Sequence, residues 1–473
     1  MNLQAASRTR AGDRAAIPGL AQFAAGIQGQ VIQAQDTAYE TARRVWNGMI
    51  DRYPALIVRC AGPADVRRAV DFARRRDLLV AIRGGGHNVA GNGTCDDGMV
   101  LDLGPMKTIE LDPVRRTVRA EPGLTWGEID RATQAAGLAL PGGIQSTTGI
   151  AGFTLGGGFG YLSRLHGLTC DHLLAAEVIT ADGVALTASA SDNPDLFWGL
   201  RGGGGNFGIV TAFTYHLVPL GPVLGGMLIH SATRAGEVLR FYREFAAAAP
   251  PALASVLIFT TAPVAPHIPV HLHGRPVLLV TLCYAGPPDE GERVIQPLRA
   301  FGPPDADLVS IRPYTEVQTL LDAANPAGLL NYWKAEYIQG YGDEAIETIL
   351  HYTAQAPSPN SKLLLNQLGG AISHVPPDAT AYAHRAAPFI ANINAMWAAP
   401  AASESAIAWA RDFWTALQPF SAGGVYVNFL SNEGEDRVRA AYEPGTYARL
   451  ATLKQKYDPT NFFRLNQNIK PTG

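Results

Sequence analysis

Cysteine is scarce in this chain. Only four cysteines occur in 473 residues, and no two of them form a Cys-x-x-Cys pair. Zinc sites and redox dithiols need closely spaced cysteines, so we predict no metal site. A disulfide framework is typical of small secreted chains rather than of a chain this long and this poor in cysteine. The four are Cys60, Cys95, Cys170 and Cys283, and their scatter suits a reducing cytoplasm.

Long apolar runs and a strong net charge are also missing. No apolar segment reaches the ~18 residues that a membrane-spanning helix needs, so we expect no membrane partner. The formal net charge is −3 with no basic stripe, which argues against nucleic acid as a partner. Residues 1–13 lack the apolar core of a secretory signal, so the sequence predicts a cytoplasmic protein. It leaves the oligomeric state open.

Glycine and proline, by contrast, are abundant, with 50 and 33 residues, and 47% of the chain is hydrophobic. This composition and length predict two or three domains with long, shaped loops. Hydrophobic periodicity predicts a βαβ unit made of a strand over 55–60, a helix over 63–75 and a strand over 78–82. Further strands are expected at 99–103, 117–121, 176–180, 209–215 and 277–283, and further helices at 126–136, 236–247 and 342–355.

The most informative stretch is Arg-Gly-Gly-Gly-His-Asn at residues 83–88, directly after an apolar strand. Three successive glycines leave a short arc of bare backbone N–H groups, which suits a diphosphate. A histidine in that arc, His87, meets whatever the arc binds. For the hexapeptide alone, a tight turn with a solvated histidine is the alternative interpretation.

Four separated segments carry a resemblance to a known family. They are 82–91 (IRGGGHNVAG), 141–160 (PGGIQSTTGIAGFTLGGGFG) running into 168–171 (LTCD), 196–210 (LFWGLRGGGGNFGIV) and 457–469 (YDPTNFFRLNQNI). In these motifs and their order, the chain resembles the berberine bridge enzyme-like FAD-linked oxidases of the vanillyl-alcohol oxidase superfamily. The resemblance runs from about residue 45 to the end.

The resemblance implies an α+β fold in which both ends of the chain build one domain. Residues 1–220 would form most of an FAD-binding domain of the PCMH type, with its core at about 52–220. Residues 221–425 would form an inserted substrate-binding domain, an antiparallel sheet flanked by helices. This insert begins near Gly221-Pro222, where the sequence starts to alternate β-rich segments with amphipathic helical segments. Residues 426–473 would return to the FAD-binding domain.

The same resemblance implies the chemistry. The histidine that matches His87 is bonded to the 8α-methyl carbon of FAD in this family. Some members add a second link through a cysteine, but Gln145 stands at that position, so a single link is expected. The family takes hydride from an alcohol, sugar or amine carbon of a small substrate to flavin N5, and O2 reoxidises the flavin to give H2O2. A dehydrogenase with another acceptor and a catalytically silent flavin-binding protein stay as alternatives.

The residues expected to bind FAD belong mainly to the glycine-rich segments, where backbone can approach the cofactor and hydroxyl groups can donate to it. For Val178, packing in the core explains an apolar residue equally well. The full set is Arg83, Gly84, Gly85, Gly86, His87, Asn88, Gly91, Pro141, Gly142, Gly143, Ser146, Thr147, Thr148, Gly149, Gly152, Gly156, Gly157, Gly158, Gly160, Val178, Asn206, Gly208, Val210, Asn461, Asn466 and Asn468.

One glycine cluster matches the sequence pattern of a different cofactor site. Residues 203–208 fit the pattern G-x-G-x-x-G of a nicotinamide Rossmann site. That site requires a helix directly after the glycines. Residues 209–215 alternate and are rich in β-branched and aromatic side chains, which predicts a strand. We therefore reject a Rossmann site, and the cluster is either a packed turn or a loop near the flavin.

Oxidation of an alcohol also needs a group that takes the hydroxyl proton. Tyr426 matches a Tyr-x-Asn-aromatic motif of the family and is the first candidate, with Tyr382 and Tyr337 next. A tyrosine needs a nearby cation or donor to act at neutral pH. The alternative for Tyr426 is a strand tyrosine that packs on a sheet. Arg385 is either a pocket residue or half of a structural ion pair, and Lys334 faces either the pocket or solvent.

Overall fold

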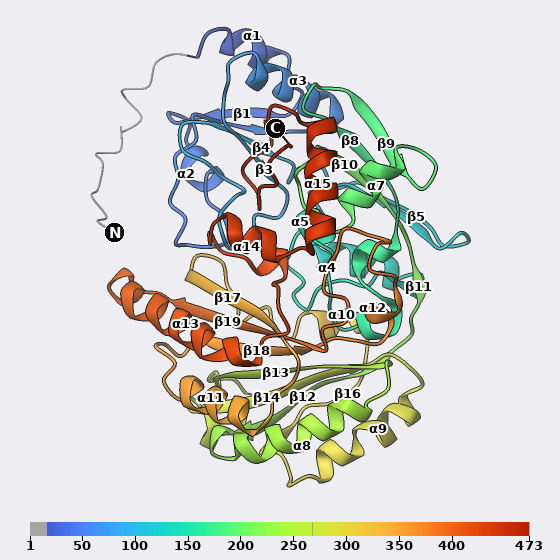
Figure 1. Cartoon of the computed structure of the whole chain (residues 1–473), viewed down its shortest axis with the longest axis vertical. Coiled ribbons are helices and arrows are strands. Elements are labelled where there is room, and N and C mark those ends of the chain that lie inside the picture. Colours follow the sequence, from blue (N-terminus) through green and yellow to red (C-terminus); the bar gives the residue numbers. More distant parts are fainter. Residues whose placement is uncertain (1–16, 267, 473) are drawn as a thin grey trace.

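A computed structural model describes residues 17–266 and 268–472 (Figure 1). The segment 1–13, for which the sequence predicts no secretory signal, lies outside the described residues. Over the two described ranges, no helix is both long and apolar enough to span a membrane. The chain forms two sheet-containing halves, stacked along the long axis of the molecule, with the cofactor motifs in the upper half of Figure 1.

A small mixed sheet holds the predicted βαβ unit. Its order is β1 (Gln30–Gln33), β2 (Leu56–Arg59), β4 (Met99–Asp102) and β3 (Val80–Arg83). Helix α3 (Pro63–Arg74) connects β2 to β3, and β4 lies between these two strands and pairs with both in parallel. Val66 and Val70 of α3 pack against Leu56 and Val58, because apolar residues recur on one face of the helix. The glycine arc follows at the end of β3.

A second, antiparallel sheet stands beside the first. Its order is β5 (Ile109–Asp112), β6 (Thr117–Ala120), β10 (Ile209–His216), β8 (Leu173–Ile179) and β9 (Ala185–Ser189). A short ladder joins β7 (Leu138–Ala139) to β11 (Val218–Pro219). As predicted, residues 209–215 are a strand, and no helix opens on the glycine cluster at 203–208. The Rossmann site is therefore excluded by the fold.

The lower half is an eight-stranded antiparallel sheet. Its order is β15 (Ala306–Asp307), β12 (Val223–Ser231), β14 (Pro276–Tyr284), β13 (Leu253–Thr261), β18 (Lys362–Gln367), β19 (Phe389–Trp397) and β17 (Leu330–Ile338), with β16 (Ser310–Arg312) paired to β12. One face packs on α8 (Ala235–Ala248), α9 (Pro288–Ala300), α11 (Asp343–Thr353) and α13 (Ser403–Leu417). The other face turns toward the upper half, where Val256 and Leu364 pack with Tyr161.

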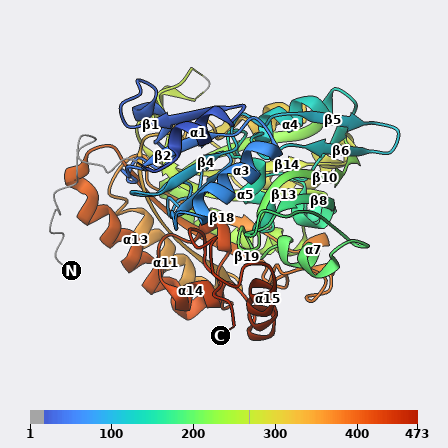
Figure 2. The ribbon, with the colours of Figure 1, turned by 90° about the horizontal axis from the view of Figure 1, so that it is seen from above.

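Further helices complete the two halves. They are α1 (Leu20–Ala25), α2 (Tyr39–Ala42), α4 (Trp126–Gln134), α5 (Ile150–Leu155), α6 (Ser163–His166), α7 (Pro194–Leu200), α10 (Tyr314–Gln318), α12 (Ala371–His374), α14 (Glu435–Ala440) and α15 (Pro444–Tyr457). Figure 2 shows α15 beside α7, so the end of the chain returns to the upper half. The predicted α+β fold is confirmed, while the domain boundaries at 220 and 425 stay a prediction.

Candidate functional site

A cavity of about 310 Å³ lies where the two halves meet. One side, the glycine wall, is formed by lining residues within 82–93, 143–155 and 204–210. The opposite side, the sheet wall, consists of Trp333, Leu364, Asn366, Asn392 and Asn394 on β17, β18 and β19. Residues 426–429, 463 and 465–467 of the C-terminal segment also line it, as do Val80, Leu103, Phe159, Leu321 and Asn325. The cavity therefore collects segments that are far apart in the sequence.

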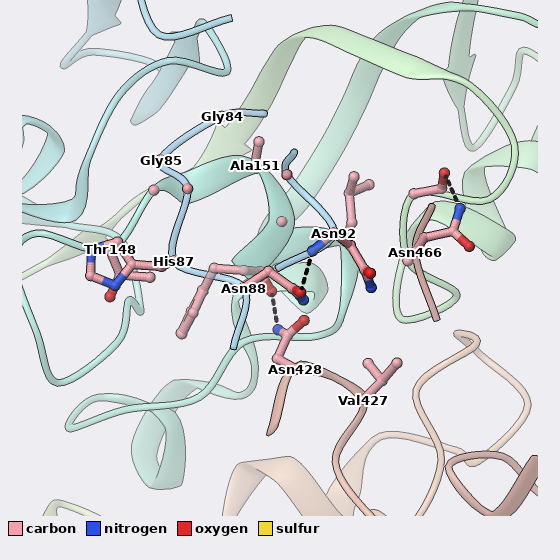
Figure 3. Close-up of a pocket in the computed structure, with 18 of the residues that line it drawn as sticks. Gly84, Gly85, His87, Asn88, Asn92, Thr148, Ala151, Val427, Asn428 and Asn466 are labelled. Atoms are coloured by element: carbon pink, nitrogen blue, oxygen red, sulfur yellow. Dashed lines mark hydrogen bonds between the residues drawn. The ribbon is translucent and has the colours of Figure 1, made fainter. Parts of the chain in front are cut away.

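Half of the residues predicted to bind FAD line this cavity. They are Arg83, Gly84, Gly85, Gly86, His87, Asn88, Gly143, Thr148, Gly149, Gly152, Gly208, Val210 and Asn466. Figure 3 shows His87 beside Thr148, with Asn88, Asn92 and Asn428 close by. The backbone N–H of Asn92 donates to Asn88 Oδ1 at 3.1 Å, which fixes the end of the arc.

The other predicted FAD-binding residues do not line the cavity. They are Gly91, Pro141, Gly142, Ser146, Thr147, Gly156, Gly157, Gly158, Gly160, Val178, Asn206, Asn461 and Asn468. Gly156 and Gly157 make room for protein side chains, since a Cβ on them would lie 2.2 Å from Asn428 Oδ1 and 2.4 Å from Tyr382 Cδ2. Val178 is buried in the core of the second sheet. A direct role for this group toward FAD stays a prediction.

Glycine serves two purposes in the glycine wall. Gly85 and Gly149 allow two loops to pack closely, because a Cβ on Gly85 would lie 2.6 Å from the Gly149 backbone. Gly152 and Gly205 line the cavity, and a Cβ on either would meet no atom within 4 Å. Their bare backbone therefore opens on free space, which is the surface that a dinucleotide needs. These residues fit an FAD.

His87 is the nucleophilic side chain on the glycine wall. Its ring stacks on the Trp46 ring, with centroids 5.2 Å apart and planes at 18°. Burial lowers the pKa of His87 to about 4, against the opposing effect of a hydrogen bond to the Thr147 backbone. The imidazole is therefore neutral near pH 7, and a neutral ring keeps a lone pair for attack. Trp46 was missed at the sequence level, because it lies outside every glycine motif.

Gln145 and its neighbour hold a loop of the lower half against the glycine wall. Gln145 Nε2 and Trp46 Nε1 both donate to the carbonyl of Asn325, at 3.3 and 3.2 Å. The backbone N–H of Ser146 donates to Asp322 Oδ1 at 3.0 Å. All four cysteines are free and buried, and none of them lines the cavity. The place expected for a second flavin link is thus occupied by a loop contact.

Tyr426 is the one proposed catalytic tyrosine that lines the cavity. It lies in no strand and immediately precedes a short 3₁₀ turn at Val427–Phe429. Its hydroxyl oxygen accepts from Asn428 Nδ2 at 2.8 Å and from the Gly158 N–H at 3.0 Å. Burial raises the pKa of Tyr426 well above its ordinary value, although these two donors act in the opposite direction. The expected donors are therefore present, and the resting side chain is a neutral phenol.

Tyr382 and Tyr337 lie behind Tyr426. Their hydroxyl oxygens are 2.8 Å apart, and both side chains are buried away from the cavity lining. The rings of Tyr382 and Tyr426 are 6.1 Å apart. Burial raises the pKa of Tyr382 and of Tyr337 above the ordinary range, so both are neutral. Neither hydroxyl group therefore faces the cavity.

Two charged candidates are structural rather than cavity residues. Arg385 forms a buried, two-pronged ion pair with Asp171, at 2.7 and 3.1 Å, and does not line the cavity. Lys334 faces neither the cavity nor solvent, which corrects both alternatives from the sequence. It is buried, pairs with Glu433 and lies over the Trp414 ring at 4.3 Å. A buried cation persists only with such a partner.

The polar residues of the sheet wall were not predicted as site residues. Its polar members, Asn366, Asn392 and Asn394, fall in apolar strands such as Ala-Asn-Ile-Asn-Ala at 391–395. An alternation of this kind predicts a strand with two different faces. It does not reveal that the polar face closes a cavity, because that depends on the packing of the two halves.

Comparison with known proteins agrees with this site. Residues 54–189 match a family described as an FAD binding domain, and residues 425–470 match one described as berberine and berberine like. The chain is 32% identical over 455 residues to an FAD-linked oxidoreductase of Dictyostelium discoideum, covering 95% of this chain and 96% of that one. It is 31% identical over 457 residues to (R)-6-hydroxynicotine oxidase of Paenarthrobacter nicotinovorans, covering 94% and 98%.

The fold is also similar to that of a solved oxidase. The crystal structure of 6-hydroxy-D-nicotine oxidase from Arthrobacter nicotinovorans superposes with a TM-score of 0.85 at 29% identity, covering 94% of this chain and 98% of that one. Both motif regions, the whole-length sequence similarity and the architecture agree. The chain therefore belongs to the berberine bridge enzyme-like family of FAD-linked oxidoreductases.

Proposed function

We propose that this protein is an oxidase that removes hydride from an alcohol, sugar or amine carbon of a small organic substrate. The observation that supports this most is the placement of a neutral imidazole, His87, and a buried phenol, Tyr426, on the lining of one cavity. When bound, FAD supplies the two-electron acceptor at N5 and passes the electrons to O2, giving H2O2. The relative (R)-6-hydroxynicotine oxidase supports an oxidase by its name.

His87 is the proposed attachment point of the flavin. It is the one nucleophilic side chain of the arc, it lines the cavity, and stacking on Trp46 holds its ring in place. The absence of a cavity-lining cysteine among all four supports a single link. Thr148, Asn88 and the open backbone of Gly152 and Gly205 would hold the rest of the cofactor.

Tyr426 is the proposed proton-handling group. Its oxygen already accepts two hydrogen bonds, and no described residue accepts its O–H. The O–H is therefore available for a substrate oxygen in the cavity. To take the hydroxyl proton of a substrate, Tyr426 must first lose its own proton, and the two donors stabilise the phenolate that results, which is the form a base needs.

The decisive experiment has two parts. Acid-precipitated protein should form a yellow pellet, and a peptide map should place flavin on His87 and on no cysteine. The flavin should then bleach anaerobically with a compound from a library of alcohols, sugars and amines. Rapid O2 consumption on reoxidation indicates an oxidase, while slow reoxidation with a fast artificial acceptor indicates a dehydrogenase. A flavin that no compound bleaches would leave the silent flavin-binding protein.

A cytoplasmic location is also a proposal, based on composition. All four cysteines are free and buried, and burial raises the pKa of Cys60 and Cys170 well above the ordinary value. Thiols of this kind are unreactive core residues rather than redox centres. Cell fractionation would test the location directly.

A further inference from the structure

The loop that connects α10 to β17, residues 319–329, bridges the two halves beside the glycine wall. Its Asn325 carbonyl accepts from the side chains of Trp46 and Gln145, both of which belong to the upper half. The backbone N–H of Gly328 donates to the Trp46 carbonyl at 2.9 Å, so this bridging loop holds Trp46 through both side chain and backbone. The lower half therefore fixes the position of a side chain of the upper half.

Trp46 connects the bridging loop to the proposed attachment point of the flavin. Its backbone N–H donates at 3.1 Å to the carbonyl of Gly86, directly before His87. Its indole ring stacks on the His87 ring, packs edge-on against Trp333 at 5.7 Å and is 7% exposed. His87 also makes a hydrogen bond to the Thr147 backbone. The plane of the imidazole is therefore defined by one stacked ring and one hydrogen bond.

Lys362 of β18 anchors the bridging loop from within the lower half. Its ammonium group donates to the Ala324 carbonyl at 2.8 Å and to Asn325 Oδ1 at 2.9 Å, and the side chain is 5% exposed. Burial lowers the pKa of Lys362 to about 8, and no carboxylate of the described residues offsets the loss of hydration. A buried ammonium group is costly unless its N–H groups are satisfied. The two loop oxygens therefore stabilise this lysine, and the lysine in turn fixes the loop.

Attachment of the flavin depends on the position of the imidazole. It forms a bond between a ring nitrogen of His87 and the 8α-carbon of FAD, and it breaks one C–H bond of that methyl group and the imidazole N–H bond. The two protons and two electrons pass to the flavin and then to O2, giving H2O2. Alignment of the reacting groups lowers the barrier of such a step, and a displacement of ~1 Å can cost about 10²-fold in rate.

On the basis of the proposed attachment, we infer that the bridging loop of the lower half positions His87 for this reaction, with Trp46 as the positioning residue. Lys362 fixes the loop at Asn325, the Asn325 carbonyl fixes the indole, and the indole fixes the plane of the imidazole. Attachment should therefore require the lower half to be packed on the glycine wall, although the histidine belongs to the upper half. The link would then mark molecules whose two halves are correctly packed.

The kinetics of attachment test this inference. Full-length protein made under riboflavin limitation would be mixed with FAD at several concentrations, and the flavin that survives acid precipitation would be followed with time. Trp46→Ala should lower the limiting rate about 10–100-fold, the effect of a misplaced reacting group, and should change the half-saturating FAD concentration less than about threefold. Trp46→Phe, which keeps a ring to stack on His87, should stay within about fivefold of the wild type. A wild-type rate for Trp46→Ala, or a rate that excess FAD restores, would overturn the inference.

Trp409→Ala controls for the loss of a buried indole. Trp409 of α13 is 8% exposed, donates through its indole N–H to the Tyr352 carbonyl at 2.9 Å, and packs on the helix-covered face of the eight-stranded sheet. Removing either tryptophan deletes a large buried side chain, so both alanine variants should lose comparable thermal stability. Trp409→Ala should still attach flavin at the wild-type rate. Equal slowing in the two variants would assign the effect to stability and contradict a positioning role.

Lys362→Met tests the bridging loop itself. The methionine keeps most of the bulk of the side chain but loses both hydrogen bonds to the loop, so the limiting rate of attachment should fall about 3–10-fold, the effect of one hydrogen bond. If Lys362 acts through Trp46, the double variant with Trp46→Ala should be no slower than Trp46→Ala alone, because residues in one chain of contacts are not additive. Rates that multiply would show that the loop acts by another route and would overturn the inference.

Failure of this inference differs from failure of the proposed function. If the wild type attaches flavin at His87 and Trp46→Ala does so equally fast, the proposed attachment stands and the inference fails. If attachment depends on Trp46 but no compound bleaches the flavin, the proposed oxidation fails and the inference stands. A wild type without acid-stable flavin, or with flavin on another residue, would overturn the proposed attachment and the inference together.

Discussion

The two walls of the cavity present different polar groups to a ligand: backbone groups in one wall and side chains in the other. In the glycine wall, Gly152 and Gly205 expose bare backbone to the cavity, and Asn88 Oδ1 is already hydrogen-bonded. In the sheet wall, strand pairing satisfies the backbone, and Asn366, Asn392 and Asn394 each keep one buried polar side-chain atom without a partner. The comparison indicates that the first wall is built for one constant ligand, and the second for a ligand that side-chain substitution can change.

The sharpest test of the glycine wall is His87→Ala. If His87 is the attachment point, acid precipitation of the variant should release all of its flavin, while the folded domain persists because the side chain is not part of the core. The colour of the pellet and a thermal unfolding curve measure the two effects. A pellet that stays yellow would exclude His87 as the point of attachment.

The variant Tyr426→Phe tests whether the tyrosine on the cavity lining handles a proton during flavin reduction. Tyr426→Phe removes only the hydroxyl, so packing should be kept, while anaerobic flavin reduction should slow by ~10²–10⁴-fold, the usual contribution of a positioned acid or base. Reoxidation by O2 should stay near the wild-type rate, and stopped-flow absorbance resolves the two half-reactions.

Tyr337→Phe is a suitable control for that experiment, because it breaks a tyrosine–tyrosine hydrogen bond outside the cavity lining. It should slow reduction by less than about tenfold. If Tyr426→Phe has an equally small effect, Tyr426 is packing, its own variant excludes Tyr337, and Tyr382 becomes the next candidate.

Lys454 tests how the C-terminal segment supports the glycine wall. Its ammonium group is fully buried, pairs with Asp458 at 2.6 Å and donates to the carbonyls of Asn206 and Phe463. Lys454→Met would leave the Asp458 carboxylate buried and unpaired, so we expect a loss of about 3–5 kcal/mol in the free energy of unfolding. Urea unfolding of the flavoprotein measures it.

The matched control lies two residues further on. Lys456 pairs with Asp195 at 2.6 Å, but both side chains are substantially exposed. An exposed pair contributes about 0–1 kcal/mol, so Lys456→Met should change the free energy of unfolding by no more than that. Equal effects of the two variants would show that burial of Lys454 has no energetic role.

The last test concerns the pH dependence of the joint between the halves. Asp130 of α4 accepts from Gln318 of α10 at 3.0 Å, and burial raises the pKa of Asp130 from 3.8 to about 7. Between about pH 4 and pH 7 the folded state keeps a proton that the unfolded state has lost. Stability should therefore be full below pH 4, fall by at most about 1.4 kcal/mol per pH unit up to pH 7, and then level off.

Asp130→Asn should remove that contribution, because the amide does not titrate. Urea unfolding at pH 5 and pH 8 would show a variant that is more stable than the wild type at the higher pH. Asp436→Asn, at an exposed position, is the control and should leave the pH profile unchanged. A wild-type profile that is flat from pH 5 to pH 8 would refute the raised pKa.

The glycine wall could be predicted from the sequence better than the sheet wall. Seven of the strands, four of the helices and the glycine segments of the glycine wall could be predicted, because backbone exposure requires glycine at fixed places and hydrophobic periodicity marks many strands and helices. Gly156 and Gly157 show the limit of that reasoning, since their missing side chains make room for Asn428 and Tyr382. The same residue type serves a ligand in one place and packing in another, and only the fold distinguishes them.

The sheet wall and the buried ion pairs could not be predicted for a different reason. Asn392 and Asn394 become meaningful only when the upper half covers their face of the sheet. Lys334 was expected in the pocket or in solvent, yet Glu433, 99 residues away, neutralises it in the interior. Contacts between distant segments decide these cases, and a local pattern contains no information about them.

The C-terminal segment supplies a part of the enclosure that neither half supplies alone. Phe463, Asn466 and Gln467 form part of the cavity lining, and Asn206 is held through the backbone of Gln467 and Ile469. Phe463 and Ile469 also belong to the buried cores of the upper half. Loss of this segment would therefore open the cavity and, at the same time, weaken the packing of the domain that surrounds it.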